Sequence, residues 1–342
     1  MKNVIFDLQL FANQVQTTLL DGLTPEMKTY YDMNLINEAE ANLIHDQFGQ
    51  KSPIPANGGK TIEFRKFSPL PKATTALTEG VTPDGKSLEV KTVIATVSQY
   101  GDYITQSDVL ELTSIDNTIV EATKLLGSQA GRTLDTIVRN VLVAGTNVSF
   151  CPKVAEDGTE TAVISRTNLD TSAKLTVKTV QKVVAKLRGQ NAPTINGKYV
   201  AIIHPYVAYD LMRDKEWIDA HKYANPTNLY EGEIGEVAGV RFVQTTEAKV
   251  WNDDTCPANG SGKYHSVFAT LFIGAGAYGV TEITGGGLQT IVKQKGSAGT
   301  ADPLDQRSSV GWKASKTAEL LIPSYLVRVE SCSPDFDETA SN

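Results

Sequence analysis

The sequence predicts an α+β fold organised around one long helix. Between Ser114 and Gly145, apolar residues recur at steps of three and four, which is the spacing of one helix face. Residues 60–104 instead alternate between apolar and polar side chains, a pattern typical of β-strands. Residues 173–298 mix helical and strand patterns, so we expect a compact region after the long helix.

The long helix is predicted to start at an Asp116 cap and to stop at Gly145. About 28 residues at 1.5 Å per residue give a rod of roughly 40 Å. Gly127 and Gly131 lie one turn apart, at a helix-propensity cost of about 1 kcal/mol each, so we expect another backbone to approach closely there. The apolar positions are Ile115, Ile119, Ala122, Leu126, Ala130, Leu134, Ile137, Val141 and Ala144.

Residues 1–56 are interpreted as an extended arm that contains one helix. Thr24 and Pro25 form a helix start signal, and Pro53 and Pro55 mark the end of the segment. Helical spacing is carried by Tyr31, Leu35, Ala39, Leu43 and Ile44.

Residues 60–104 predict a long hairpin. Ile62 and Phe64 alternate with charged residues in the first strand, and Leu88, Val90, Thr92, Ile94 and Thr96 alternate in the second. The connection between them is rich in proline, threonine and glycine. Because an isolated two-stranded ribbon is marginal in water, we expect another subunit to cover this hairpin.

The region after the long helix is predicted to begin with a polar loop at 146–172. The predicted elements that follow are a helix at 175–188, a buried strand at 198–204, a short helix opened by Pro205, turns and strands at 229–248, strands at 267–273 and 288–295, and β-like sequence at 309–330.

Composition excludes several classes of protein. The chain has 342 residues, of which 41% are apolar. Its formal charge of −7 argues against a protein that binds nucleic acid over its whole surface. Apolar runs fall far short of the ~20 residues that span a bilayer, so no membrane partner is expected. Three scattered cysteines and four histidines without ligand spacing predict neither a disulfide framework, nor a metal site, nor a cofactor. His204, before Pro205, is more simply a structural histidine than a catalytic one.

Two glycine patterns keep a nucleotide-binding enzyme open as the alternative function. Gly80–Ser87 matches the phosphate-loop pattern G-x-x-x-x-G-K-S, but a strand-like sequence follows where that chemistry needs a helix. Gly274–Gly279 matches the dinucleotide pattern G-x-G-x-x-G, and a strand pattern again follows. Hairpin and packing turns are the simpler interpretation of both.

Four regularly spaced lysines lie in or just before the predicted helix at 175–188. Lys174, Lys178, Lys182 and Lys186 are four residues apart, which predicts one face of that helix. The plain interpretation is a solvated face. The sharper hypothesis is contact with an acidic patch on a neighbouring copy, or with nucleic acid.

Taken in order, these pieces resemble the major capsid protein of tailed bacteriophages, with the Hong Kong 97-type fold, and specifically the group named after phage N-four. The resemblance covers nearly the whole chain after Pro25. The segments that carry it are residues 58–85, 97–135, 229–248 and 302–314.

The resemblance implies a role for each region. Residues 1–56 would be the N-terminal arm, 57–105 the E-loop, 106–172 the P-domain with the spine helix, 173–298 the A-domain, and 299–342 the return to the P-domain with a C-terminal tail. At the E-loop tip, Glu79, Asp84 and Lys86 would contact a neighbouring subunit.

The resemblance also implies a function without catalysis. Such a protein assembles with itself into hexamers and pentamers of an icosahedral shell in the host bacterial cytoplasm, with scaffolding protein and a portal as partners. The finished virion encloses double-stranded DNA, which the acidic chain would contact weakly and without specificity. LQLFA (residues 8–12) is similar to an extension that a host protease removes, which predicts cleavage between Ala12 and Asn13.

Overall fold

The computed structural model describes two compact units. The described residues are 35, 39, 43–53, 60–67, 70, 72–77, 79–82, 84–113, 118–155, 157–222, 235–259, 262–282, 288–297, 302–336 and 340–342. Unit 1 contains Tyr100–Ala130 and Leu288–Ala314, together with Leu35 and Ala39. Unit 2 contains Ala41–Gln99, Gly131–Gly287 and Ser315–Asn342.

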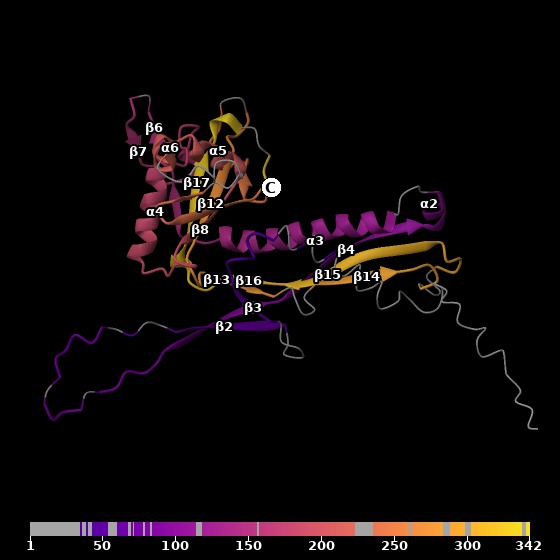
Figure 1. Cartoon of the computed structure of the whole chain (residues 1–342), viewed down its shortest axis with the longest axis horizontal. Helices are drawn as coiled ribbons and strands as arrows, with labels where there is room; N and C mark the ends of the chain where they lie inside the picture. The colour runs from indigo at the N-terminus through magenta and orange to yellow at the C-terminus, as the bar shows by residue number, and fades with distance from the viewer. Residues whose placement is uncertain are drawn as a thin grey trace, which may run out of the picture. The chain divides into compact units, whose positions relative to one another are not determined.

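The predicted long helix is confirmed as α3, Thr118–Val143, which passes from unit 1 into unit 2 (Figure 1). Its buried stripe advances in steps of four through Ala122, Leu126, Ala130, Leu134, Val138 and Leu142. The prediction was therefore right from Ala122 to Leu134. It was wrong elsewhere: Ile119, Ile137 and Val141 are only half-buried, and Ala144 is exposed. A strict four-residue step follows the helix's own ridge, which inclines across the axis, so the buried face turns gradually along the helix.

The ends of α3 differ from the prediction. Asp116 and Ile115 lie outside the described residues. Gly145 follows the helix end by two residues, and its amide donates to the Leu142 carbonyl oxygen at 3.2 Å. Its φ is not positive, so it does not end the helix through the left-handed conformation that was expected.

Unit 2 is built on a seven-stranded mixed sheet. The order along it is β5 (Val148–Phe150), β17 (Leu326–Cys332), β12 (Val267–Ile273), β8 (Tyr199–Ile203), β10 (Val240–Gln244) and β9 (Glu236–Val237), with β11 (Val250–Trp251) paired to β12. Every residue of β8 and β12 is buried, which explains their continuous apolar sequences.

The sheet is covered on both faces. Ala201, Ile203 and Phe272 belong to one apolar cluster with the inner residues of α4 (Val177–Gly189), which Figure 1 shows beside the sheet. Ile202 and Leu271 point the other way and pack with the second half of α3. Helices α5 (Pro205–Met212) and α6 (Lys215–Lys222) follow β8 in the chain.

Unit 1 contains a three-stranded sheet in the order β14 (Leu288–Lys293), β15 (Arg307–Lys316), β4 (Ser98–Ser107). Glycines allow β4 and β15 to lie unusually close. A Cβ on Gly101 would sit 2.6 Å from the Trp312 carbonyl oxygen, and one on Gly311 would sit 2.7 Å from Tyr103 Cβ. A short helix, α2 (Asp108–Thr113), follows β4 and was not expected from the sequence.

The predicted hairpin is confirmed as β2 (Thr61–Phe67) paired antiparallel with β3 (Val90–Thr96). Its two faces are unlike. Ile62 and Phe64 are buried and pack in one cluster with Ala95 and Leu321 of the same chain. The apolar set predicted for β3 lies on the opposite face, where Val90 and Ile94 are exposed.

Smaller elements complete the described chain. β1 (Gln50–Ser52) runs parallel to β13 (Tyr278–Thr281), which pairs on its other side with β16 (Ala318–Leu320). β6 (Lys153–Val154) and β7 (Glu160–Thr161) form a hairpin, and 3₁₀ turns occupy Arg166–Asn168, Pro323–Tyr325 and Pro334–Phe336. Among the described helices, none is long and apolar enough to cross a membrane.

Candidate assembly surfaces

The connection between β2 and β3 exposes apolar side chains that its own chain does not cover. Leu70, Leu77, Val81 and Leu88 are each more than half exposed. None of the described residues between the two strands lies in a helix or a strand, and Figure 1 shows this connection as a long open loop. Because soluble monomers rarely expose such a group of leucines and valines, this loop is a candidate contact surface.

The charged residues predicted at the loop tip are placed alongside these apolar ones. Glu79, Asp84 and Lys86 are all exposed. None of the three forms an ion pair with another described residue of the chain. Their charges are therefore available to a neighbouring molecule.

Neither glycine pattern has the geometry of a nucleotide site. Gly80, at φ 79°, lies in the open loop, and Ser87 leads into strand β3. Gly274–Gly279 joins β12 to strand β13, and a Cβ on Gly279 would lie 2.4 Å from the Phe64 ring. The second pattern thus lets the hairpin pack closely, while the helix N-terminus that would face a phosphate is missing after both.

The four lysines do not form one helix face. Helix α4 begins at Val177, with Thr176 as its cap, so Lys174 lies before the helix and the prediction is wrong for it. Lys174 Nζ lies 3.6 Å from the buried Asp210 carboxylate, and Lys178 Nζ lies 2.8 Å from Glu160. Lys182 and Lys186 have no ion pair with any described residue, so only this half of the set is electrostatically free.

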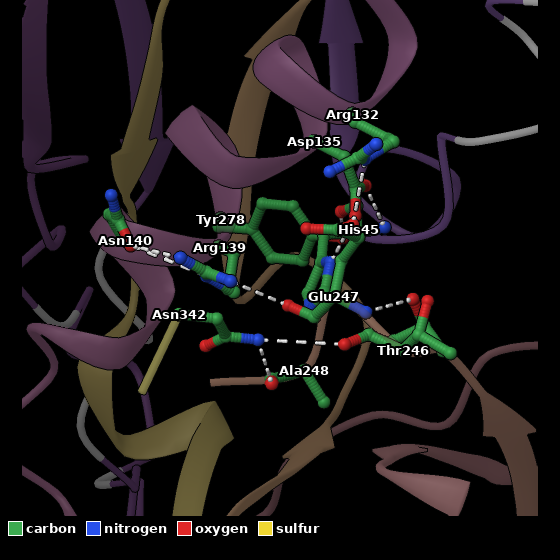
Figure 2. Close-up of polar contacts among 11 residues, drawn as sticks. His45, Arg132, Asp135, Arg139, Asn140, Thr246, Glu247, Ala248, Tyr278 and Asn342 are labelled. Carbon is green, nitrogen blue, oxygen red and sulfur yellow. Dashed lines mark hydrogen bonds and ion pairs between the residues drawn. The ribbon is translucent and has the colours of Figure 1, made fainter. Parts of the chain in front are cut away.

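A buried polar cluster holds the segment just before the hairpin. His45 Nδ1 and Asp135 Oδ2 are 2.7 Å apart, and the His45 amide donates to Asp135 Oδ1 at 2.7 Å. The hydroxyl of Tyr278 donates to the His45 carbonyl oxygen at 2.5 Å (Figure 2). Lys316 pairs with Asp46 and donates to the Thr281 carbonyl oxygen at 2.8 Å.

Burial dominates the electrostatics of this cluster. It lowers the pKa of the Lys316 amine, against the opposing effect of Asp46, and it raises the pKa of the Tyr278 hydroxyl well above its ordinary value. Each charged group of the cluster has a partner. Removing one partner would leave a lone buried charge and lower the stability of the fold by about 3–5 kcal/mol. No sequence pattern predicts this cluster, because its members are dispersed over the whole chain.

A second polar cluster surrounds Glu247 on the turn between β10 and β11. Arg132 Nε lies 3.0 Å from the Glu247 carboxylate, and Arg139 Nη1 donates to the Glu247 carbonyl oxygen at 2.8 Å. Figure 2 shows both arginines reaching this residue from α3. Arg139 is buried, and that burial lowers the pKa of its guanidinium. Besides the Glu247 carbonyl oxygen, its acceptor is Asn140 Oδ1, which receives Nε at 3.3 Å and Nη2 at 3.2 Å.

His204 is a structural residue. It caps helix α5, with Nδ1 accepting from the Tyr206 amide at 3.3 Å, and burial lowers the pKa of its imidazole to about 4. None of the three cysteines forms a disulfide, all three are buried, and burial raises the pKa of the Cys151 thiol to about 12. No group of three potential metal ligands occurs among the described residues.

Gly127 and Gly131 are both buried on α3, one in each unit. Ala12 and Asn13 lie outside the described residues.

Comparison with known proteins identifies the family. A family model described as "Phage capsid protein" matches residues 49–298, well over half of the chain. The chain belongs to this family of phage capsid proteins. No curated protein sequence matches it.

Solved capsid structures share the fold of this capsid protein. The capsid of Ralstonia phage GP4 has a TM-score of 0.63 at 12% identity, covering 86% of this chain and 90% of that one. The capsid of cyanophage P-SCSP1u has a TM-score of 0.62 at 14% identity, covering 85% and 88%. The capsid of cyanophage Pam1 has a TM-score of 0.58 at 13% identity, covering 80% and 86%.

The capsid protein therefore has the predicted α+β, Hong Kong 97-type fold. Its family makes it a structural protein of the virion, and the nucleotide-binding enzyme is set aside.

Proposed function

We propose that this capsid protein assembles with itself into hexamers and pentamers of an icosahedral shell that encloses double-stranded phage DNA. The observation that carries the proposal is the hairpin. Its base packs on its own chain, while the outer face of β3 and the connecting loop expose apolar side chains. Contacts that are modest singly become strong when closed symmetry repeats them around a shell.

In this proposal residues 57–105 act as an E-loop that lies across an adjacent subunit. Leu77 and Val81 supply apolar area at the contact. The charged side chains of Glu79, Asp84 and Lys86 orient the contact, because they favour a partner surface of complementary charge. Residues 1–56 would be the N-terminal arm, 106–172 and 299–342 the P-domain, and 173–298 the A-domain. The similarity of residues 58–85 and 97–135 supports membership in the group named after phage N-four.

The other candidate residues take roles in the same assembly. Gly127 and Gly131 would allow close packing on the spine helix, so Gly127→Leu should block folding or assembly. Lys182 and Lys186 would meet an acidic patch on a neighbour or the packaged DNA. Replacing both by glutamine should change particle yield or nucleic-acid content; unchanged values of both would refute this role.

Processing and partners complete the proposal. Cleavage between Ala12 and Asn13 predicts that Asn13 is the first residue in mature virions, and mass spectrometry that finds Met1 there would refute it. Scaffolding protein and a portal would act during assembly in the host cytoplasm. A net charge of −7 suits a container that touches DNA only weakly.

The decisive experiment is electron microscopy of the full chain expressed with its scaffolding protein. Rings, capsomers or closed particles are expected for the natural chain. Leu77→Ser combined with Val81→Ser should abolish them, whereas Thr74→Ser in the same exposed loop should not. A monodisperse monomer that binds ATP, with binding lost in Lys86→Ala, would overturn the shell in favour of the enzyme.

A further inference from the structure

We propose that the buried side chains of Lys316 and Asp46 join through an amide bond, which closes a covalent loop within one chain. The two residues are 270 positions apart in the sequence, yet their side chains pair directly. Asp46 belongs to the segment just before the hairpin, and Lys316 is the last residue of β15. Both residues lie in unit 2. Because the bond forms inside a single subunit, it does not depend on the proposed assembly.

The contact brings together the two groups that an amide bond needs. Lys316 Nζ pairs with Asp46 Oδ1, which places the amine next to the carboxyl carbon that it would attack. Lys316 is 1% exposed and Asp46 is 5% exposed, so bulk water has little access to either side chain. Two reacting groups held in this way reach effective concentrations of about 10⁵–10⁸ M. Exclusion of water also protects the product from hydrolysis.

The backbone around Asp46 is fixed on both sides. The amide of His45 donates to Asp135 Oδ1 and the His45 ring lies against Asp135 Oδ2, both at 2.7 Å. The Tyr278 hydroxyl donates to the His45 carbonyl oxygen at 2.5 Å (Figure 2). After Asp46, strand β1 pairs in parallel with β13. The fold itself therefore holds the Asp46 carboxyl group against Lys316.

The surroundings favour the neutral amine, which is the reactive form of lysine. Burial lowers the pKa of the Lys316 amine, and the positive charge of Lys51 lowers it further, while Asp46 and Asp135 oppose these effects. Transfer of one proton from the Lys316 ammonium to the Asp46 carboxylate leaves an amine and a carboxylic acid, so neither group keeps a buried charge. A desolvated neutral lysine is a nucleophile, and the protonated carboxyl group is its substrate.

The reaction needs no other reactant. The nitrogen lone pair of Lys316 attacks Asp46 Cγ and forms the C–N bond. The bond from Cγ to the carboxyl hydroxyl then breaks, and the hydroxyl group leaves as water with a proton from the nitrogen. The Thr281 carbonyl oxygen accepts from Lys316 Nζ at 2.8 Å, so it stabilises the positive charge that develops on the nitrogen before this proton leaves. One water molecule is released, and nothing is oxidised or reduced.

Mass spectrometry of the denatured full chain tests the bond. After any removal of N-terminal residues is counted, the natural chain should be lighter than its sequence by the mass of one water molecule. Fragmentation should identify a branched peptide that joins residues 46 and 316. Lys316→Arg keeps a positive charge beside Asp46 but lacks the amine, so it should have its full mass. Lys313→Arg, at an exposed lysine of the same strand, is the matched control and should keep the mass deficit.

Two further measurements separate the amide bond from other losses of water. A succinimide at Asp84–Gly85 or Asp157–Gly158 would remove the same mass, but mild base reopens a succinimide and leaves an amide intact. In denaturing gel electrophoresis the natural chain should migrate ahead of Lys316→Arg, because a closed loop of 270 positions makes the unfolded chain more compact. The proposal is wrong if the natural chain has its full sequence mass, or if the mass deficit persists in Lys316→Arg.

Discussion

The seven-stranded sheet and the β2–β3 hairpin contain similar apolar residues but bury them to different extents. All seven residues of β12 are buried, between α4 on one face and α3 on the other. In β3, only Ala95 is buried, although the strand is richer in β-branched residues than β12. The sheet obtains its stability inside the chain. The hairpin leaves apolar side chains such as Val90 and Ile94 exposed.

The difference follows from what covers each face. Apolar surface stabilises by about 25 cal/mol for each Å² removed from water, and β12 has two covered faces. The hairpin has one, where Phe64 reaches Gly279 and Leu321. Substitutions in the sheet should therefore change folding, and substitutions at the loop tip should change assembly. Four measurements test this difference between the sheet and the hairpin.

The largest effect is expected from Phe272→Ala in β12. Removing a fully buried ring should lower the free energy of unfolding by about 3–5 kcal/mol. Denaturant titration measures the change, and Ile94→Ala on the exposed face of β3 is the matched control, expected to cost under about 1 kcal/mol. Equal losses in both variants would contradict the comparison.

Acid should act on the sheet through His204. Its folded pKa of about 4 lies below the unfolded value near 6.5, so the unfolded state binds more protons between these values. Stability should therefore fall as the pH drops from about 6.5 to 4, by up to about 3 kcal/mol. His204→Asn keeps a capping acceptor and should flatten that slope, as measured by unfolding at several pH values. A slope that persists in this variant would assign the acid response to other groups.

A smaller, local effect is expected from Gly279→Ala. The added methyl group would lie 2.4 Å from the Phe64 ring and should push the base of the hairpin away from β13. This should lower the free energy of unfolding by about 1–3 kcal/mol. Hydrogen exchange in β2 should accelerate while β12 stays protected. Gly189→Ala, where nothing lies within 4 Å of the new methyl group, is the control.

The smallest effect on stability is expected at the loop tip. Leu77→Ser combined with Val81→Ser should leave the unfolding free energy of the chain within about 0.5 kcal/mol, because both side chains are exposed. Particle formation should nevertheless fail. Loss of stability without loss of assembly would reverse the roles assigned to the two regions.

Several elements were predictable because their signals are local. The four-residue recurrence that includes Leu126 and Leu134 indicated α3, and the continuous apolar run at 267–273 matched β12 residue for residue. Leu35 and Ala39 of the arm are helical and buried, as their spacing predicted, whereas Leu43 is buried outside a helix. The phosphate-loop pattern at Gly80 was correctly interpreted as a hairpin turn, because a strand and not a helix follows it.

The burial of the hairpin was not predictable in the same way. β3 has apolar residues on both faces, so alternation alone favoured Val90 and Ile94, while Phe64 and Leu321 cover the face of Ala95 instead. Lys174 continued a four-residue spacing, yet Thr176 begins the helix after it. The His45–Asp135 pair joins residues 90 positions apart, and no spacing in the sequence announces it.

Local sequence patterns predict the long helix, the hairpin and the buried strands of this protein, and they predict a strand at each of the two glycine patterns. These depend on residues within a few positions of one another, through backbone preference and periodic burial. Packing between distant segments instead sets which face of the hairpin is covered, which lysines are paired, and which groups hydrogen-bond to Arg139 and His45. Those outcomes depend on which segments, distant in the sequence, pack against each other and exclude water. The periodicity of one segment does not show which other segment packs against it.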